Sequence, residues 1–166
     1  MSTSTRETEI IVDQDVPLVR IIREFDAPPE KVFRAHTDPD LFVQWLGPRS
    51  TETQIHHFDC RRGGSYRYQM SSDGEADGFY GSFHEVRPAE VIVQTFTFDG
   101  VPDGVALERM EFERLDDGRT RLTSTSLVDS FEGRDAFVAS GMEVGVVEGY
   151  QRLDEMLARG ADDGAS

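Results

Sequence analysis

The chain has 166 residues and a formal net charge of −15, from 32 acidic and 17 basic side chains. This charge repels phosphate backbones and anionic lipid surfaces, so neither nucleic acid nor a membrane is expected as a partner. The single cysteine, Cys60, cannot form a disulfide within the chain, and no apolar run approaches the roughly 18 residues of a membrane span, so we expect a cytoplasmic protein.

Both ends of the chain are polar. Residues 1–15 and 160–166 consist mainly of small, hydroxyl-bearing and acidic side chains without periodicity, which is typical of flexible tails. Between them, residues 16–159 carry the apolar patterning expected of a single domain. This domain begins with a segment rich in Val and Ile near residues 18–25, which predicts a strand.

Two short helices are predicted after this first strand. Proline is tolerated in the first turn of a helix, so Pro28-Pro29 begins one helix and Asp38-Pro39 begins the next, which ends at Gly47-Pro48. The following region alternates short strands with turn dipeptides, namely Gly63-Gly64, Asp73-Gly74, Arg87-Pro88 and Asp117-Gly118. Together these segments predict about seven antiparallel strands.

The C-terminal segment, residues 131–159, predicts one long helix with an apolar face, regular from Arg134 and with Asp135 as a candidate N-cap. The side chains in one sector of about 100° are Val138, Met142, Gly145, Val146, Gly149, Leu153 and Met156. Glycine also recurs every fourth residue from Gly141, although each glycine costs a helix about 1 kcal/mol relative to alanine. Either these glycines let the helix approach or bend around the sheet, or they leave room for a ligand.

Aromatic side chains alternate along the predicted strands. One face of each strand carries a stripe, namely Tyr66, Tyr68 and Met70, then Ile92, Gln94, Phe96 and Phe98, then Glu108, Met110 and Phe112. Such stripes are typical of a core, but they also suit a cavity wall in which tyrosine hydroxyls orient a ligand. The predicted fold class is therefore α+β, with a seven-stranded curved antiparallel sheet wrapped around the C-terminal helix.

The sequence offers little for metal or nucleophilic catalysis. Its four histidines form no HExxH pattern, and we expect them at the surface or at strand edges. In a regular strand the neighbours His56 and His57 point to opposite faces and cannot chelate one ion together. The GxSxG, Walker and Rossmann fingerprints are absent, so we predict no metal, no cofactor and a binding protein rather than an enzyme.

Four segments, TDPDLFVQWLGP, FDCRRGGSYRYQM, GSFHEVRPAEVIVQTF and GMEVGVVEGYQRLDEML, resemble the SRPBCC superfamily in its heat-shock-protein ATPase activator homologue-like branch. The likeness extends from about residue 18 to residue 158. It implies a helix-grip fold, related to birch-pollen-allergen and START lipid-transfer domains, with a cavity between helix and sheet. Five residues match positions of the family, where their roles are either structural or functional, namely Trp45, Asp59, Arg61, Gly63 and Gly64. Related sequences often carry tryptophan near residue 146 or 147 and serine at 149, so the small residues here imply a larger cavity.

The resemblance leaves several functions open, because the superfamily includes lipid carriers, polyketide cyclases and chaperone partners on one scaffold. We predict binding of a small hydrophobic or aromatic ligand between the C-terminal helix and the sheet. The alternatives are a module that docks on a chaperone or another protein, and a polyketide cyclase-like enzyme using Tyr66, Tyr68, Gln94 and Glu108 as polar groups. An exposed edge strand would also allow a homodimer. The predicted lining residues are Trp45, Phe58, Tyr66, Tyr68, Phe83, Gln94, Phe96, Met110, Phe112, Met142, Val146 and Gly149.

Overall fold

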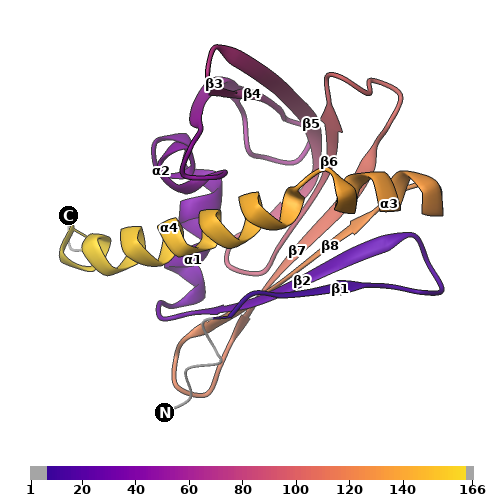
Figure 1. Ribbon diagram of the computed structural model, residues 1–166. Coiled ribbons are helices and arrows are strands. Elements are labelled where there is room, and N and C mark those ends of the chain that lie inside the picture. The colour runs from indigo at the N-terminus through magenta and orange to yellow at the C-terminus, as the bar shows by residue number, and fades with distance from the viewer. Residues whose placement is uncertain (1–6, 164–166) are drawn as a thin grey trace.

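The computed structural model describes residues 7–163. Within this range an antiparallel sheet curves around a long helix, and two short helices lie at one end (Figure 1). The strands are β1 (Glu9–Val12), β2 (Leu18–Phe25), β3 (Glu52–Phe58), β4 (Ser65–Ser72), β5 (Glu75–Arg87), β6 (Val91–Phe98), β7 (Ala106–Arg114) and β8 (Thr120–Leu127). The helices are α1 (Pro29–Thr37), α2 (Pro39–Trp45), α3 (Phe131–Ala139) and α4 (Met142–Asp163).

The strand order across the sheet is β1-β2-β8-β7-β6-β5-β4-β3. Strands β3 to β8 form a meander, and β2 extends the sheet by pairing with β8. The sheet stays open, with β1 and β3 as its two edges. Helices α1 and α2 are inserted between β2 and β3, and α4 passes in front of the sheet (Figure 1). This arrangement confirms the predicted helix-grip fold of class α+β.

The sheet of the described residues has eight strands, so the predicted number of seven was wrong. The additional strand, β1, lies within the segment that the sequence predicted to be a tail. Its four residues are too few to show a strand period, but they pair in register with β2, for example Ile10 opposite Ile21. At the other end, α4 continues to Asp163, into the predicted C-terminal tail. Residues 1–6 and 164–166 of the two predicted tails lie outside the described range.

The turn dipeptides were predicted correctly, whereas the strand irregularities were not. Asp73 and Gly74 join β4 to β5 with φ of 55° and 83°, as a tight hairpin turn requires. The register of β3 shifts between Ile55 and His57, and this bulge exposes both His56 and His57. Their rings contact side chains of β4 instead of pointing to opposite faces, so that expectation fails at the bulge.

The C-terminal helix is broken rather than continuous. Gly141 has φ of +92°, a conformation that favours glycine, and it separates α3 from α4. The N-cap of α3 is Ser130, whose hydroxyl accepts a hydrogen bond from the Gly133 N–H at 2.9 Å. The predicted cap, Asp135, instead pairs with Arg134 at 2.9 Å. None of the described helices is long and apolar enough to cross a membrane.

Candidate ligand-binding site

A polar row crosses the concave face of the sheet. Gln94 on β6 lies opposite Glu108 on β7, which lies opposite Ser126 on β8. The Gln94 amide donates to one carboxyl oxygen of Glu108 at 3.0 Å, and the Ser126 hydroxyl donates to the other at 2.8 Å. Three adjacent strands therefore place one carboxyl group, held by two neutral donors, on a face that is otherwise mainly apolar.

Tyr66 extends this row from β4. Its hydroxyl donates to the Thr95 carbonyl at 2.6 Å and accepts from the Gln94 amide at 3.3 Å. Burial, and secondly the charge of Glu108, raise the pKa of Tyr66, so the phenol stays protonated over the physiological range. Tyr66 therefore fixes the Gln94 amide and cannot act as a base.

Glu108 is desolvated but not fully enclosed. Burial raises the pKa of its carboxyl, and the hydrogen bonds from Ser126 and Gln94 oppose that shift. Within residues 7–163 no salt bridge reaches it. Its side chain nevertheless keeps partial exposure. A carboxyl that is both desolvated and accessible is typical of the wall of an interior space.

Two further tyrosine hydroxyls have no partner. Tyr68 and Tyr150 are only 5% and 8% exposed, yet neither hydroxyl makes a hydrogen bond within the described part of the chain. Of the side-chain nitrogen and oxygen atoms there, the only one both fully enclosed and unpartnered is Arg23 Nε. The two hydroxyls must therefore keep accessible surface. Burial raises the pKa of both phenols, and the charge of Glu108 is the second cause. Tyr68 and Tyr150 therefore both lie within range of the electrostatic field of Glu108.

The interior between α4 and the sheet has two unlike halves. The closed half adjoins α1, α2 and the C-terminal part of α4, and its side chains are almost completely buried, namely Phe25, Val32, Trp45, Leu153 and Met156. The open half lies on the central strands and the N-terminal part of α4, and its side chains are only partly buried, namely Gln94, Phe96, Glu108, Met110, Met142 and Val146. The gradient of burial thus follows the length of α4.

Most of the predicted lining residues come together. Those with less than a tenth of their surface exposed are Trp45, Tyr66, Tyr68, Phe83 and Phe112. Those that are partly buried against the same apolar cluster are Phe58, Phe96, Met110, Met142 and Val146. Gln94 belongs to the polar row. The matched pair Asp59 and Arg61 lies apart from them, as an exposed ion pair at 2.9 Å.

Gly149 has a different environment from the other predicted lining residues. A Cβ atom added there would lie 3.3 Å from the Trp45 carbonyl oxygen and 3.4 Å from the Gly47 nitrogen. Glycine at this position therefore lets α4 approach the end of α2 closely. Trp45 also joins α2 to its neighbours, because its indole N–H donates to the Ala35 carbonyl at 3.0 Å and its ring stacks on Tyr150 of α4. Of the two interpretations of the helix glycines, close approach holds at this position.

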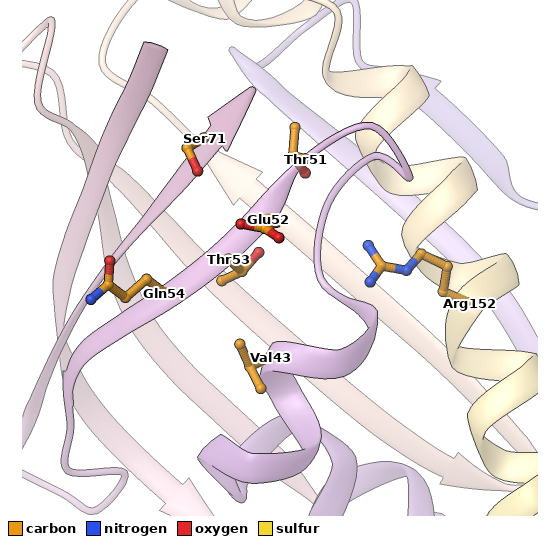
Figure 2. Close-up of a pocket in the computed structure, with 7 residues that line it drawn as sticks. All are labelled: Val43, Thr51, Glu52, Thr53, Gln54, Ser71 and Arg152. Carbon is orange, nitrogen blue, oxygen red and sulfur yellow. The ribbon is translucent and has the colours of Figure 1, made fainter. Parts of the chain in front are cut away.

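A polar pocket of about 420 Å³ lies at the edge strand β3 (Figure 2). Its lining residues are Val43, Thr51, Glu52, Thr53, Gln54, Ser71 and Arg152. Arg152 extends from α4 toward the segment after α2, where it donates to the carbonyls of Gln44 at 2.8 Å and Gly47 at 3.3 Å. Its guanidinium thus stabilises the end of α2, and the remaining polar groups form no nucleophile–base pair.

His36 departs from the expected surface position. It is 6% exposed, its Nδ1 lies 2.8 Å from the Val32 carbonyl, and its ring packs against Trp45 and Phe112. Burial lowers the pKa of His36 to about 4, so its imidazole is neutral at physiological pH. It belongs to the closed half and takes no part in the polar row.

Three polar residues at the interior were not predicted. Ser126 shares the face of Leu122 and Ser124, an alternation that the sequence does contain. Tyr150 lies just outside the apolar sector that was predicted for the C-terminal helix. Arg23 is 2% exposed and pairs with Asp154 at 2.6 Å, and no short sequence pattern relates residues so far apart.

Comparisons with known proteins agree with this geometry. Residues 26–158 match the family model described as Activator of Hsp90 ATPase homolog 1-like protein. The chain belongs to this family. It is thereby a member of the SRPBCC superfamily, as the sequence predicted. No curated protein matches the chain.

Solved structures of the same fold come from several bacteria. Protein Ms6760 of Mycobacterium smegmatis is 24% identical, with a TM-score of 0.83 over 91% of this chain and 97% of that one. A Rhodobacter sphaeroides protein is 27% identical, with a TM-score of 0.82 over 92% and 99%. DynU16, from the dynemicin biosynthetic locus, is 23% identical, with a TM-score of 0.66 over 87% of this chain and 48% of that one. This AHSA1-type fold supports a module that binds a ligand or a partner.

Proposed function

We propose that this protein binds a small, mainly aromatic molecule in the open half, between α4 and the concave face of the sheet. The observation that carries the proposal is the pair of unpartnered hydroxyls on Tyr68 and Tyr150, together with the accessible carboxyl of Glu108. Deeply buried side chains normally pair their polar atoms within the protein. Polar atoms left free among apolar side chains are what a ligand site requires.

The apolar walls of the open half suit a flat, hydrophobic body. Phe79 stacks on Phe96 with ring centroids 5.4 Å apart, and Tyr68 lies 5.5 Å from Phe79. Met110 and Met142 are partly buried, and methionine adapts its shape to different contacts. Because these side chains are not fully enclosed, covering them with a ligand would remove further apolar surface from water.

Two variants of α4 test the proposal. Val146→Trp would fill the open half, whereas Val144→Trp places the same ring at a position that is 53% exposed. Isothermal titration with the neutral probe 1-naphthylmethanol should show one site in the wild type and in Val144→Trp, and binding at least about tenfold weaker in Val146→Trp. Circular dichroism must show that both variants fold. Equal binding to the folded Val146→Trp variant, or no binding of either this probe or its cationic analogue 1-naphthylmethylamine to the wild type, would refute the proposal.

Docking on a protein partner is the second candidate. The β6–β7 connection exposes a group of large apolar side chains, namely Phe98, Val101, Val105 and Leu107. Membership of a family described by ATPase activation supports a partner as well as a ligand. Purified Hsp90 ATPase assayed with the wild type and with a Val101→Ser, Leu107→Ser variant would decide this candidate. An unchanged ATPase rate with the wild type would reject it.

A further inference from the structure

The carboxyl of Glu108 lacks a balancing positive charge. Both of its oxygens accept hydrogen bonds from neutral donors, and no salt bridge to it occurs within residues 7–163. The buried cation on the same face, Arg23, is bound to Asp154 at 2.6 and 3.1 Å. Buried carboxylates are usually paired with a cation, because desolvation of a lone charge is costly. The protein itself supplies no such cation to Glu108.

The surroundings of Glu108 suit a cation attached to an aromatic ring. Tyr66 and Tyr68 stack with centroids 5.9 Å apart, and the electrostatic influence of Glu108 reaches both of them. Aromatic faces attract ammonium groups, and a free phenol oxygen accepts a hydrogen bond from an N–H donor. The unpartnered hydroxyls of Tyr68 and Tyr150 can therefore accept hydrogen bonds from N–H donors of a ligand.

We infer that the ligand of the open half is an aralkyl ammonium ion, an aromatic ring that carries a protonated amine on a short alkyl arm. The ammonium group pairs with Glu108, and the ring lies among the aromatic side chains of β4 to β6. This inference rests on the proposed function, since it names the ligand class of the same site. An anionic ligand would be repelled by Glu108, and a neutral one would leave its charge unbalanced.

The net charge of the whole protein also favours a cationic ligand, but it does not determine where that ligand binds. The net charge of −15 attracts any cation, and salt screens that attraction over about 8 Å at physiological ionic strength. A charge-assisted hydrogen bond inside the open half is screened much less. Measurements at 150 mM salt therefore separate the two contributions.

The test compares two probes with the same ring. Isothermal titration at pH 7 and about 150 mM salt would measure 1-naphthylmethylamine, which is cationic, against 1-naphthylmethanol, which is neutral. The wild type should bind the amine at least about tenfold more tightly, since hydrogen bonds to charged groups contribute more than neutral ones. Equal affinities would overturn the inference and leave the proposed function standing. No binding of either probe would overturn both.

Two substitutions on β7 locate the effect. Glu108→Gln keeps the shape and one acceptor oxygen, and its new amide N–H can donate to the Ser126 hydroxyl, while Glu111→Gln removes the same charge from the exposed face of the strand. The amine preference should disappear in Glu108→Gln and persist in Glu111→Gln, and binding of the alcohol should change less than about threefold in Glu111→Gln. An amine preference that survives Glu108→Gln would assign it to the overall charge and overturn the inference. The wild-type comparison decides the ligand class even where a variant fails to fold.

Discussion

The two halves of the interior share one helix and one sheet but differ in how they are filled. In the closed half α1 and α2 supply side chains such as Val32 and Trp45, and Leu153 of α4 is completely buried between them and the sheet. In the open half no inserted helix is present, and Met142 and Val146 of α4 stay partly exposed. The apolar face of one helix can therefore stabilise the fold at one end and leave accessible surface at the other.

The polar groups of the two halves follow the same division. In the closed half Arg23 and Asp154 neutralise each other at 2.6 Å. In the open half Glu108 has neutral donors alone, and the Tyr68 hydroxyl has no partner in the described residues. The unpartnered hydroxyl of Tyr150 lies at the border with the closed half, because its ring packs on Phe25 and Trp45. A charge balanced within the protein contributes to folding, whereas an unbalanced one is available for a ligand.

Breaking the buried ion pair should have the largest effect on stability. Asp154→Ala leaves the guanidinium of Arg23, which is 2% exposed, without its counter-charge, and should cost about 3–5 kcal/mol of unfolding free energy in urea. The matched control is Glu155→Ala, whose partner Arg49 lies at the same distance of 2.6 Å but at the surface. Its loss should be much smaller, because solvent screens an exposed ion pair. Similar losses in both variants would contradict the distinction between buried and exposed pairs.

Truncating one apolar residue in each half tests the difference in packing. Leu153→Ala should cost about 3 kcal/mol, because Leu153 is fully buried and the variant creates a cavity. Met142→Ala should cost less than about 1.5 kcal/mol, since Met142 keeps part of its surface in water. Urea unfolding measures both. A loss at Met142 as large as that at Leu153 would show that the open half is packed like a core.

The buried histidine gives the closed half a pH dependence. The pKa of His36 is about 4 in the folded state against about 6.5 when unfolded, so the unfolded state takes up a proton first as the pH falls. Stability should therefore be lost between pH 6.5 and 4, by up to about 3 kcal/mol, and be unaffected by this group above pH 7. The measure is the difference in unfolding free energy between the wild type and His36→Gln across this range. A difference that does not change with pH would contradict it.

The sequence predicted the features that depend on neighbouring residues. The dipeptide Asp73-Gly74 specified its hairpin, and alternation placed Glu108, Met110 and Phe112 together on the less exposed face of β7. It did not predict β1, because four residues carry too little periodicity. Nor did it predict the bulge that exposes both His56 and His57, since a bulge depends on the partner strand.

The candidate site was predicted as a set of residues but not as a geometry. Alternation assigned Tyr66, Gln94 and Glu108 to faces of three strands, and hydrogen bonds join these side chains in the structure. The free hydroxyls of Tyr68 and Tyr150 depend on side chains from other elements that pack around them, and the buried guanidinium of Arg23 is already paired with Asp154 and leaves Glu108 without a cation. These relations join residues far apart in the chain, so no local pattern records them.

Of the substitutions considered for stability, Glu108→Gln should have the smallest effect. It should not lower the stability at pH 7, whereas the others do. A carboxyl whose folded pKa is raised favours the folded state at low pH and destabilises it as the pH rises above the unfolded value of about 4.3. Glu108→Gln should therefore be at least as stable as the wild type at pH 7, in contrast to Asp154→Ala. Urea unfolding at pH 7 and pH 4 measures this. A clear loss at pH 7 would give Glu108 a structural role.

The methionine methyl groups test the central claim, that a ligand enters the open half, most directly. Met110 and Met142 lie in the open half, Met156 lies in the closed half, and the Met70 side chain lies beside Gly47 just after α2. A titration of methyl-labelled protein with 1-naphthylmethylamine, followed by NMR, should shift the Met110 and Met142 signals and leave Met156 and Met70 unchanged. Shifts confined to Met70, or no shift at any of the four, would contradict the account.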